Sequence, residues 1–459
     1  MPRRCFFGAL PIVSAGPAFA GEETGTTIRR WWREEPFRLV QTNLRETDAA
    51  LDPVRLVKQV AAFPANTLLF GLGGIVAYYP TTAQFHYPSA YLPPGRDLFG
   101  AILEEAHARR IRVIGRFDLT KAQKAVYDAH PEWFFRKANG EPAIYNGLYA
   151  TCINGGYWRE QAFKILTEAL EKFEVDGLFF NGIGNSSADY SGNYLGFCHC
   201  GNCRTRFRER YGRELPSSPD SDYQQFLAGA AREVTTRISG LIHLKRPGAV
   251  FLNGVDALTA ESNTAVDRPL PMWPYSASDN VNRIRNSNPS MMAFNLCIGF
   301  VDIPYRLVTV PPAEVQIRLY QSMAHGAGPA FVAVGTLDQE DRSGVNAARP
   351  VFAWHARHED LYAGQENAAR VLLLAGRAAD YRGLFRILSE EHIPFAVSSN
   401  LDWLDRGKRP YDLVISPDNI SVAGSPAALT TAGPLPAPVQ RTPEASTPRR
   451  AAGFASGGA

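Results

Sequence analysis

The sequence of 459 residues has no run of about 20 uninterrupted apolar residues, which is the length that a membrane-spanning helix needs. It also has no excess of one charge, because 48 basic residues are balanced by 45 acidic ones and no basic stripe appears. This balance excludes the usual electrostatic pattern of a nucleic-acid-binding protein. We therefore expect neither a nucleic acid nor, for the processed chain, a membrane as a partner.

Common cofactor and catalytic motifs are also missing. We find no Gly-rich phosphate loop and no Ser-His-Asp spacing, and residues 71–74 (GLGG) lack the helix and spacing of a dinucleotide site. We expect no organic cofactor. What is present is an ordinary globular composition, with 45% hydrophobic and 20% charged residues, which allows a large core.

Residues 1–20 have the features of an export signal. Arg3 and Arg4 form a charged start, residues 5–15 are a short apolar stretch, and residues 18–20 (AFA) are a small-residue cleavage site. The two arginines with the residues after them also resemble a twin-arginine signal. We expect export to the periplasm or the exterior, and the alternative is a chance basic start on a cytosolic protein.

Apolar strands alternate with amphipathic helices from residue 37 to about residue 360. This pattern is typical of a parallel sheet covered by helices, and eight such strands predict a (β/α)8 TIM barrel over residues 30–362. No convincing helix separates the fifth strand from the sixth. The expected strands are residues 37–44, 67–72, 112–117, 177–181, 250–253, 256–260, 291–296 and 330–335.

A second unit is expected at residues 366–418. Its three short strands, with a helix after the first, form a β-α-β-like run, which predicts a truncated flavodoxin-like α/β unit. Residues 419–459 are rich in Ala, Pro, Thr, Ser and Gly and have no periodicity, so we expect a disordered tail.

Four of the six cysteines have the spacing of a metal site. Cys198, Cys200 and Cys203 form a C-x-C-x-x-C cluster after the fourth strand, and Cys152 follows the third. Neighbouring barrel strands bring these loops to one end, where four thiolates can close a structural zinc site. Disulfides in an oxidising compartment are the alternative, although Cys198 and Cys200 are too close to pair with each other. Cys297, inside an apolar strand, is expected to be a buried structural thiol.

The cysteine loop CHCGNC at residues 198–203 resembles that of glycoside hydrolase family 42 β-galactosidases, and residues 151–154 resemble the source of that family's fourth zinc ligand. As a whole, roughly from residue 30 to 415, the chain is more similar to the hypothetical glycosyl hydrolase 6 family. Segments VDGLFFN, DYSGNY and the ESN to WPYS region carry this similarity. It implies a barrel, a flavodoxin-like trimerisation-type domain and a glycosidase activity on a carbohydrate. It also implies a homo-oligomer, weakened here by the truncated second unit.

Asn181 departs from related families. The segment VDGLFFN also resembles the fourth strand of α-L-fucosidases, which implies an aspartate nucleophile where Asn181 stands. An amide cannot attack a sugar or take up a proton, so we expect Asn181 to bind a substrate hydroxyl. A non-catalytic carbohydrate-binding barrel protein is therefore the alternative hypothesis to an exported glycoside hydrolase.

Glycoside hydrolysis requires two carboxyl groups, which a barrel presents at the carboxyl ends of its strands. Glu261 at the end of the sixth strand is our first candidate, with a cap partner as its alternative role. Asp118 after the third strand and Asp341 after the eighth are the candidate partners. Each has a neighbouring arginine, Arg116 or Arg342, with which it can instead form an ion pair.

Other polar and aromatic side chains follow the strand ends, where aromatic faces stack on sugar rings and Arg or His bind hydroxyls or carboxylates. Each of them alone can equally well be a packing residue. Besides Asn181, the candidate substrate-binding residues are Arg45, Tyr79, His86, Trp273 and Tyr275.

Overall fold

The computed structural model describes residues 30–264, 273–302, 305–376, 379–399 and 411–417. The expected export signal and the expected disordered tail lie outside these residues. Within the part of the chain that is described, no helix combines the length and the apolar character needed to cross a membrane.

Eight parallel strands close into a barrel in the order β1-β11-β10-β9-β8-β7-β3-β2. All eight strands expected from the sequence are present, and the predicted (β/α)8 architecture is confirmed. The barrel strands are β1 (Leu39–Asn43), β2 (Thr67–Gly74), β3 (Arg112–Asp118), β7 (Gly177–Phe180), β8 (Val250–Leu252), β9 (Ala257–Ser262), β10 (Met292–Ile298) and β11 (Ala330–Val334).

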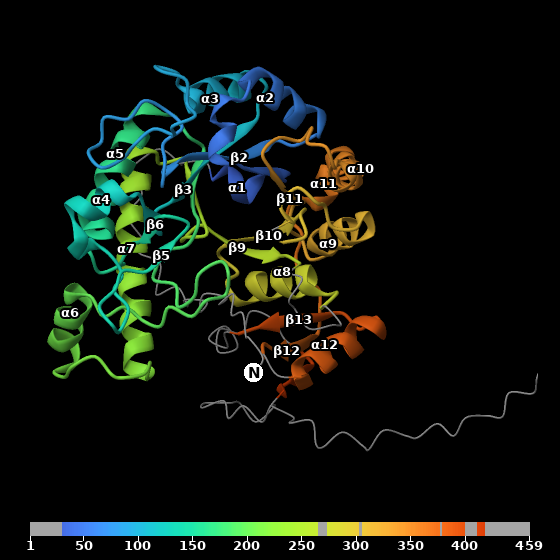
Figure 1. Ribbon diagram of the computed structural model, residues 1–459. Helices are drawn as coiled ribbons and strands as arrows, with labels where there is room; N and C mark the ends of the chain where they lie inside the picture. The colour runs from blue at the N-terminus through green and yellow to red at the C-terminus, as the bar shows by residue number, and fades with distance from the viewer. Residues whose placement is uncertain (1–29, 265–272, 303–304, 377–378, 400–410, 418–459) are drawn as a thin grey trace, which may run out of the picture.

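Helices surround the barrel (Figure 1). Residues 253–256 join β8 directly to β9 without a helix, as the missing helical pattern predicted. The helices between the other strands include α2 (Pro53–Ala62), α3 (Leu98–Ala108), α5 (Ala162–Lys172), α6 (Gly201–Tyr211), α7 (Ser221–Lys245), α8 (Ser276–Ser287), α9 (Pro312–Ala324) and α10 (Ser343–Arg357).

Local sequence explains where the first helices begin. The Asp52 side chain accepts a hydrogen bond from the backbone N–H of Arg55, and Pro53 occupies the first turn of α2. The Asp97 side chain caps α3 in the same way, through the N–H of Gly100. Such caps satisfy amide groups that the first turn of a helix leaves without partners.

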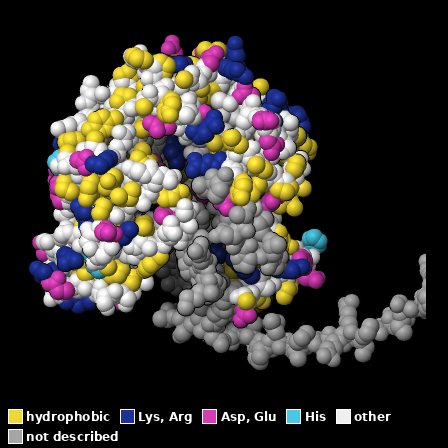
Figure 2. Space-filling view, viewed as in Figure 1, with side chains coloured by type: hydrophobic (Ala, Val, Ile, Leu, Met, Phe, Trp, Pro, Cys, Tyr) yellow, Lys and Arg dark blue, Asp and Glu magenta, His cyan; other side chains and the backbone are white. Residues whose placement is uncertain are grey.

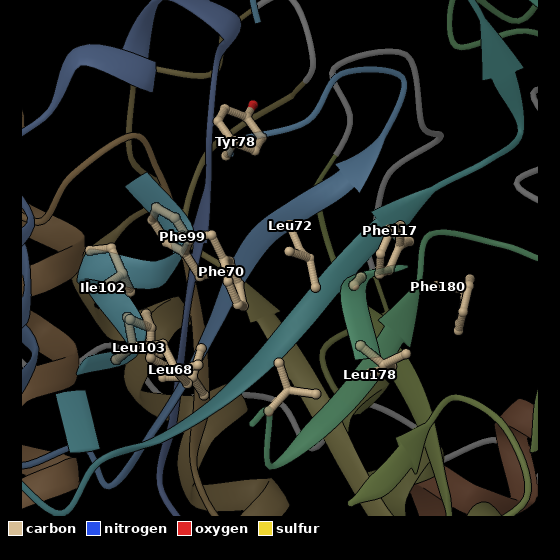
Figure 3. Packing of buried hydrophobic residues seen from close by; sticks show 14 of the residues in the cluster. Leu68, Phe70, Leu72, Tyr78, Phe99, Ile102, Leu103, Phe117, Leu178 and Phe180 are labelled. Atoms are coloured by element: carbon tan, nitrogen blue, oxygen red, sulfur yellow. The ribbon is translucent and has the colours of Figure 1, made fainter. Parts of the chain in front are cut away.

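The barrel buries both faces of its strands. Leu68, Phe70 and Leu72 of β2 face outward with Phe99 and the other apolar residues of α3 (Figure 3). The alternating residues point into the barrel, so that β2 is buried at every position. At the amino end, Trp31 and Trp32 of α1 (Trp31–Glu34) pack with the inner cluster and close it.

The third barrel strand is followed by a long excursion before α5. It contains a small antiparallel sheet in the order β4-β6-β5. This sheet places Lys121 and Tyr145 beyond the carboxyl end of β3. Its elements are β4 (Lys121–Ala122), α4 (Lys124–Ala129), η2 (Pro131–Trp133), β5 (Ile144–Tyr145), β6 (Leu148–Ala150) and the π-helical turn η3 (Tyr157–Gln161).

The C-terminal part contains a parallel sheet in the order β13-β12-β14. The first strand lies in the middle, which is how a flavodoxin-like sheet begins. The domain limits and the weakened homo-oligomer stay predictions. The elements after the barrel are α11 (Glu359–Tyr362), β12 (Val371–Leu374), α12 (Ala379–Glu390), β13 (Phe395–Ser398) and β14 (Leu413–Ile415).

Helix α8 lies between the barrel and this second sheet (Figure 1). Its buried Asn282 binds the edge of β13 with both side-chain atoms. Nδ2 donates to the carbonyl of Phe395 over 3.0 Å, and Oδ1 accepts from the N–H of Val397 over 2.8 Å. An amide on the shared helix therefore satisfies the backbone of the sheet.

Candidate active site at the barrel mouth

Three predicted residues meet at the carboxyl ends of the strands. Asp118 ends β3, Asn181 follows β7, and Glu261 lies near the end of β9. The Asn181 Nδ2 donates to Asp118 Oδ2 over 2.8 Å and to the hydroxyl of Tyr190 over 3.1 Å. The Asp118–Asn181–Tyr190 network thus joins two strand ends to the loop after β7.

Asp118 is held by hydrogen bonds and not by its neighbouring arginine. Its Oδ1 accepts from the N–H and the hydroxyl of Thr120, over 3.1 and 2.6 Å, and its Oδ2 accepts from Asn181. Among the described residues there is no Arg116–Asp118 ion pair, so that alternative does not explain either residue. The three donors hold the Asp118 carboxyl group in a fixed orientation.

Glu261 lies on the same side of the barrel as this network. Its side chain is exposed, and its backbone carbonyl accepts from Asn280 Nδ2 over 3.1 Å. Burial raises the pKa of Tyr190 to about 12, and the negative charges of Asp118 and Glu261 act in the same direction. Two candidate carboxyl groups therefore act electrostatically on one phenol at the barrel mouth.

Asp341 is placed differently. Its Oδ2 accepts from the N–H and the hydroxyl of Thr309, each over 2.9 Å, and its Oδ1 accepts from the N–H and hydroxyl of Ser343. These hydrogen bonds hold the pKa of Asp341 well below its usual range, and the backbone N–H of Thr309 contributes most. Asp341 thus ties the loop after β10 to the start of α10, which favours a structural role over the predicted catalytic one.

Tyr79 and His86 are buried, at 0% and 4% exposure, so a sugar cannot reach them. The Tyr79 hydroxyl donates to Glu168 Oε2 over 2.9 Å. The His86 Nε2 accepts from the N–H of Gly74 over 3.1 Å, and burial lowers the pKa of His86 to about 4. Both side chains instead hold the loop after β2 in place.

Trp273 and Tyr275 pack against the C-terminal unit. Their rings lie 5.5 and 5.9 Å from the ring of Phe385 in α12, between centroids. The Tyr275 hydroxyl also donates to Glu390 Oε1 over 3.2 Å. The aromatic pair predicted for sugar stacking therefore belongs to the contact between α8 and α12.

Arg45 stays at a strand end but already has a partner. Its Nη2 lies 2.7 Å from Asp48 Oδ1, and its Nε donates to Asp48 Oδ2 over 3.1 Å. The guanidinium is about half exposed, so this pair stabilises the fold little.

Two further side chains at the mouth are missing from the sequence prediction. The Lys121 Nζ lies 4.5 Å from the ring centroid of Tyr190, and the Tyr145 ring lies 5.8 Å from the same ring. Tyr190 is in the segment DYSGNY, so a signal for it existed. No sequence motif pointed to Lys121 or Tyr145, because their position depends on the small antiparallel sheet.

The four predicted metal ligands come together. The sulfur atoms of Cys152, Cys198, Cys200 and Cys203 all lie within 4.8 Å of one another, and all four residues are buried. Cys152 Sγ lies 3.4 Å from Cys203 Sγ and 3.6 Å from each of the other two. A disulfide bond is about 2.05 Å long, whereas four sulfurs around one zinc ion lie about 3.8 Å apart.

Amide donors surround these sulfur atoms. The backbone N–H of Asn154 points to Cys152 Sγ and its Nδ2 to Cys203 Sγ, each over 3.4 Å. Hydrogen bonds from the three neighbouring thiols lower the pKa of Cys200, whereas those of Cys152 and Cys203 are raised. A divalent metal bound among the four sulfur atoms would stabilise all of them as thiolates. The donor set therefore fits a metal ion.

The comparisons agree with this geometry. Residues 52–182 match the family model described as hypothetical glycosyl hydrolase 6. The matched residues, which form part of the (β/α)8 barrel, are therefore similar to a glycosyl hydrolase. The matched segment includes β2, β3 and β7 together with Cys152 and Asp118, and it ends just after Asn181. None of the curated proteins matches this chain.

Several solved glycosidase structures have a similar fold. The α-L-fucosidase isoenzyme 2 from Paenibacillus thiaminolyticus has a TM-score of 0.67 at 18% identity, over 85% of this chain and 61% of that chain. The β-galactosidase from Rahnella sp. R3 has a TM-score of 0.60 at 14% identity, over 83% and 67%. A catalytic mutant of a GH42 β-galactosidase from G. stearothermophilus has 0.59 at 14%, over 84% and 69%.

This chain thus spans about three fifths of the length of the fucosidase that it resembles. The predicted resemblance to the glycosyl hydrolase 6 family, to family 42 β-galactosidases and to fucosidases is confirmed, and at these identities the structural likeness describes the fold alone.

Proposed function

We propose that this chain hydrolyses O-glycosidic bonds of a carbohydrate at the carboxyl end of its barrel. The observation that carries the proposal is the Asp118–Asn181–Tyr190 network with Glu261 beside it. One fixed carboxylate, Asp118, and one exposed carboxyl group, Glu261, thus stand at strand ends, where barrel enzymes place their catalytic residues. The glycosyl hydrolase match over residues 52–182 supports this reaction class.

In the proposed mechanism, Glu261 gives a proton to the leaving oxygen while the bond between that oxygen and the anomeric carbon breaks. Asp118 stabilises the positive charge that develops at the anomeric carbon, either by forming a bond to it or by activating water. Where Asp118 has bonded to the anomeric carbon, water displaces it and gives its proton to Glu261. Where Asp118 activates water, Asp118 takes that proton and releases it to solvent, from which Glu261 regains its own. Asn181 positions Asp118. It does not act as the nucleophile that the resemblance to fucosidases implies at this position.

A panel of aryl glycosides tests this function. Wild-type protein should release the aryl alcohol from at least one sugar, and Glu261→Gln should reduce the rate by roughly 10²- to 10⁴-fold, because general acid catalysis contributes about that much. The melting temperature should stay within a degree. Asp118→Asn should also reduce the rate, whereas unchanged turnover in Glu261→Gln would refute the assignment.

The second candidate is a carbohydrate-binding barrel without catalysis. It is favoured by Asn181, whose amide follows the fourth barrel strand and is already bound to Asp118. Binding of an oligosaccharide by wild-type protein, with no hydrolysis across the whole panel, would support this candidate.

We also propose that the four cysteines hold a structural zinc ion. The ion would link the loop before α5 to the start of α6 and stabilise the region beside the barrel mouth. Metal analysis should find about one zinc per chain, and Cys200→Ser should remove it. Cys297→Ser is the control, because Cys297 is buried outside the cluster. Metal-free protein with disulfide-bonded cysteines would contradict the proposal.

Finally, we propose that the protein is exported, on the basis of the sequence pattern in residues 1–20. Replacing both Arg3 and Arg4 by Lys should keep a tagged full-length chain inside the cells, as cell fractionation can show. Equal export of the two forms would argue against a twin-arginine route.

A further inference from the structure

Arg116 is an unpaired cation at the barrel mouth. It lies on β3 two residues before Asp118, in register with Gly71 of β2 and Phe179 of β7. Strand alternation places it on the same inner face as Ile114, which belongs to the barrel interior. Its Nε is buried and has no hydrogen-bond partner, and within the described ranges Arg116 forms no ion pair.

Arg116 as a whole is half-buried, so its guanidinium is only partly exposed to water. Removing a guanidinium from water costs free energy that an anion normally offsets through charge-assisted hydrogen bonds. The nearest carboxylate along the strand is that of Asp118, which accepts from Thr120 and Asn181 and forms no ion pair with Arg116. An anion from outside the chain would therefore complete the surroundings of Arg116.

Lys121 adds a second positive charge nearby. It follows β3 by three residues, and its Nζ lies over the Tyr190 ring and 3.4 Å from Thr120 Oγ1. Burial lowers the pKa of Lys121, the negative charge of Asp118 opposes this shift, and the positive charge of Arg116 adds to it. Figure 2 shows a few Lys and Arg side chains beside a hollow near the centre of the face in view.

We propose that the sugar bound at the barrel mouth carries an acidic group, a carboxylate as in a uronic acid or a sulfate ester, which Arg116 and Lys121 bind. The inference rests on the carbohydrate function proposed above and specifies its substrate class. A guanidinium presents two parallel N–H donors that match a carboxylate or sulfate, whereas a neutral hydroxyl leaves the charge uncompensated. Tyr190, whose ring lies beneath Lys121 Nζ and whose hydroxyl accepts from Asn181, adds an aromatic side chain to the site.

A purely structural role predicts a different outcome. If Arg116 only balanced the charges of Asp118 and Glu261, its replacement would change the hydrolysis of acidic and neutral sugars equally and would shift the pH profile for both. If it binds an acidic group, the loss is confined to acidic sugars. The ratio of the two specificity constants therefore separates the roles.

The test compares matched 4-nitrophenyl substrates in both anomeric forms: glucuronide with glucoside, galacturonide with galactoside, and the 6-sulfated forms of the two neutral sugars. Wild-type protein should prefer one acidic substrate, and Arg116→Gln should reduce its kcat/KM by roughly 10- to 100-fold, the value of charge-assisted hydrogen bonds. The kcat/KM for the neutral substrate of the same pair should change less than threefold. A preference for the carboxylate or for the sulfate identifies the source of the charge.

Arg110→Gln is the matched control. Arg110 is exposed and lies just before the amino end of β3, so the variant removes the same charge from the opposite end of the barrel. It should leave the preference unchanged. Arg116→Lys keeps the charge without the planar fork and should fall between wild type and Arg116→Gln. Lys121→Gln tests the same site if Arg116→Gln does not fold.

Binding measured without turnover separates this inference from the hydrolase proposal. Calorimetry should show binding of D-glucuronate, D-galacturonate or D-glucose 6-sulfate but not of D-glucose. This binding should weaken when the salt concentration rises from about 20 to about 200 mM, which shortens the screening length roughly threefold. The Arg116→Gln variant should not bind these acidic sugars. Such binding with no hydrolysis would retain the inference and reject the hydrolase. Hydrolysis of neutral sugars, with no preference for and no binding of acidic ones, would overturn the inference alone.

Discussion

The Glu168 side chain offers the sharpest test of how this barrel is held together. It lies on α5 and accepts five hydrogen bonds from the loop after β2. The donors are the Tyr79 hydroxyl, the Thr81 hydroxyl, the N–H and hydroxyl of Thr82 and the N–H of Ala83. Burial alone would raise the pKa of Glu168, but the hydrogen bonds, first those of Thr81 and Thr82, outweigh it and lower the pKa from 4.5 to about 2.

The lowered pKa gives the size of the effect. At about 1.4 kcal/mol per pKa unit, the shift corresponds to roughly 3 kcal/mol of stability, and partial exposure of the carboxylate reduces this to about 2 kcal/mol. Glu168→Gln should therefore lower the free energy of unfolding at pH 7 by about 2 kcal/mol. For a barrel of this size the melting temperature should fall by about 3 °C.

The pH dependence follows from the direction of the shift. Because the pKa in the folded state lies below that in the unfolded state, the contribution is complete above about pH 4.5 and is lost as the pH falls through about 2. At pH 3 less than half of the difference between wild type and Glu168→Gln should remain. Urea unfolding followed by tryptophan fluorescence at both pH values measures it.

Glu171→Gln is the control for this prediction. Glu171 lies on the same helix and is more than half exposed, with Lys245 Nζ 2.6 Å from its Oε1. The Glu171→Gln replacement should lower the free energy of unfolding by less than about 1 kcal/mol. Equal effects of the two variants, or a Glu168→Gln effect that does not change between pH 7 and pH 3, would refute the role given to the hydrogen bonds.

Three other changes have expected outcomes. Asp341→Asn should lower the melting temperature by a few degrees and leave kcat/KM within about twofold, as thermal and kinetic assays can show, because its hydrogen bonds tie two loops. Asn282→Ala should increase hydrogen exchange in β13 without changing exchange in the barrel strands, because it removes two hydrogen bonds to that strand. Asn181→Asp should destabilise the protein at pH 7 and less so at pH 4, in urea titrations, because it places a second carboxylate 2.8 Å from Asp118.

Much of the site could be predicted where the relevant signal is local. Glu261, Asp118 and Asn181 were identified because each follows an apolar strand, and the strands form where they were expected. The same rule also selected Tyr79 and Trp273, but neither side chain lies at the barrel mouth. It identifies the end of a strand but not whether the next side chain turns toward the barrel axis or toward a helix.

The sequence by itself determined the barrel strands of this protein and their order. Alternating apolar periods, helix caps such as Asp52 and the C-x-C-x-x-C spacing act over a few residues, so their consequences are visible along the chain. Even the missing helix between β8 and β9 was visible, because a helix requires a periodic apolar face.

Only the tertiary structure decided which side chains are buried and which ones have partners. Tyr79 is covered because Glu168, 89 residues later, accepts its hydroxyl, and Trp273 is covered because α12 packs on it more than 100 residues later. Arg116 forms no ion pair within the described residues, although the Asp118 carboxylate, bound by Thr120 and Asn181, follows it by two residues. Burial and pairing depend on contacts between distant segments, and these contacts exist only once the barrel has closed.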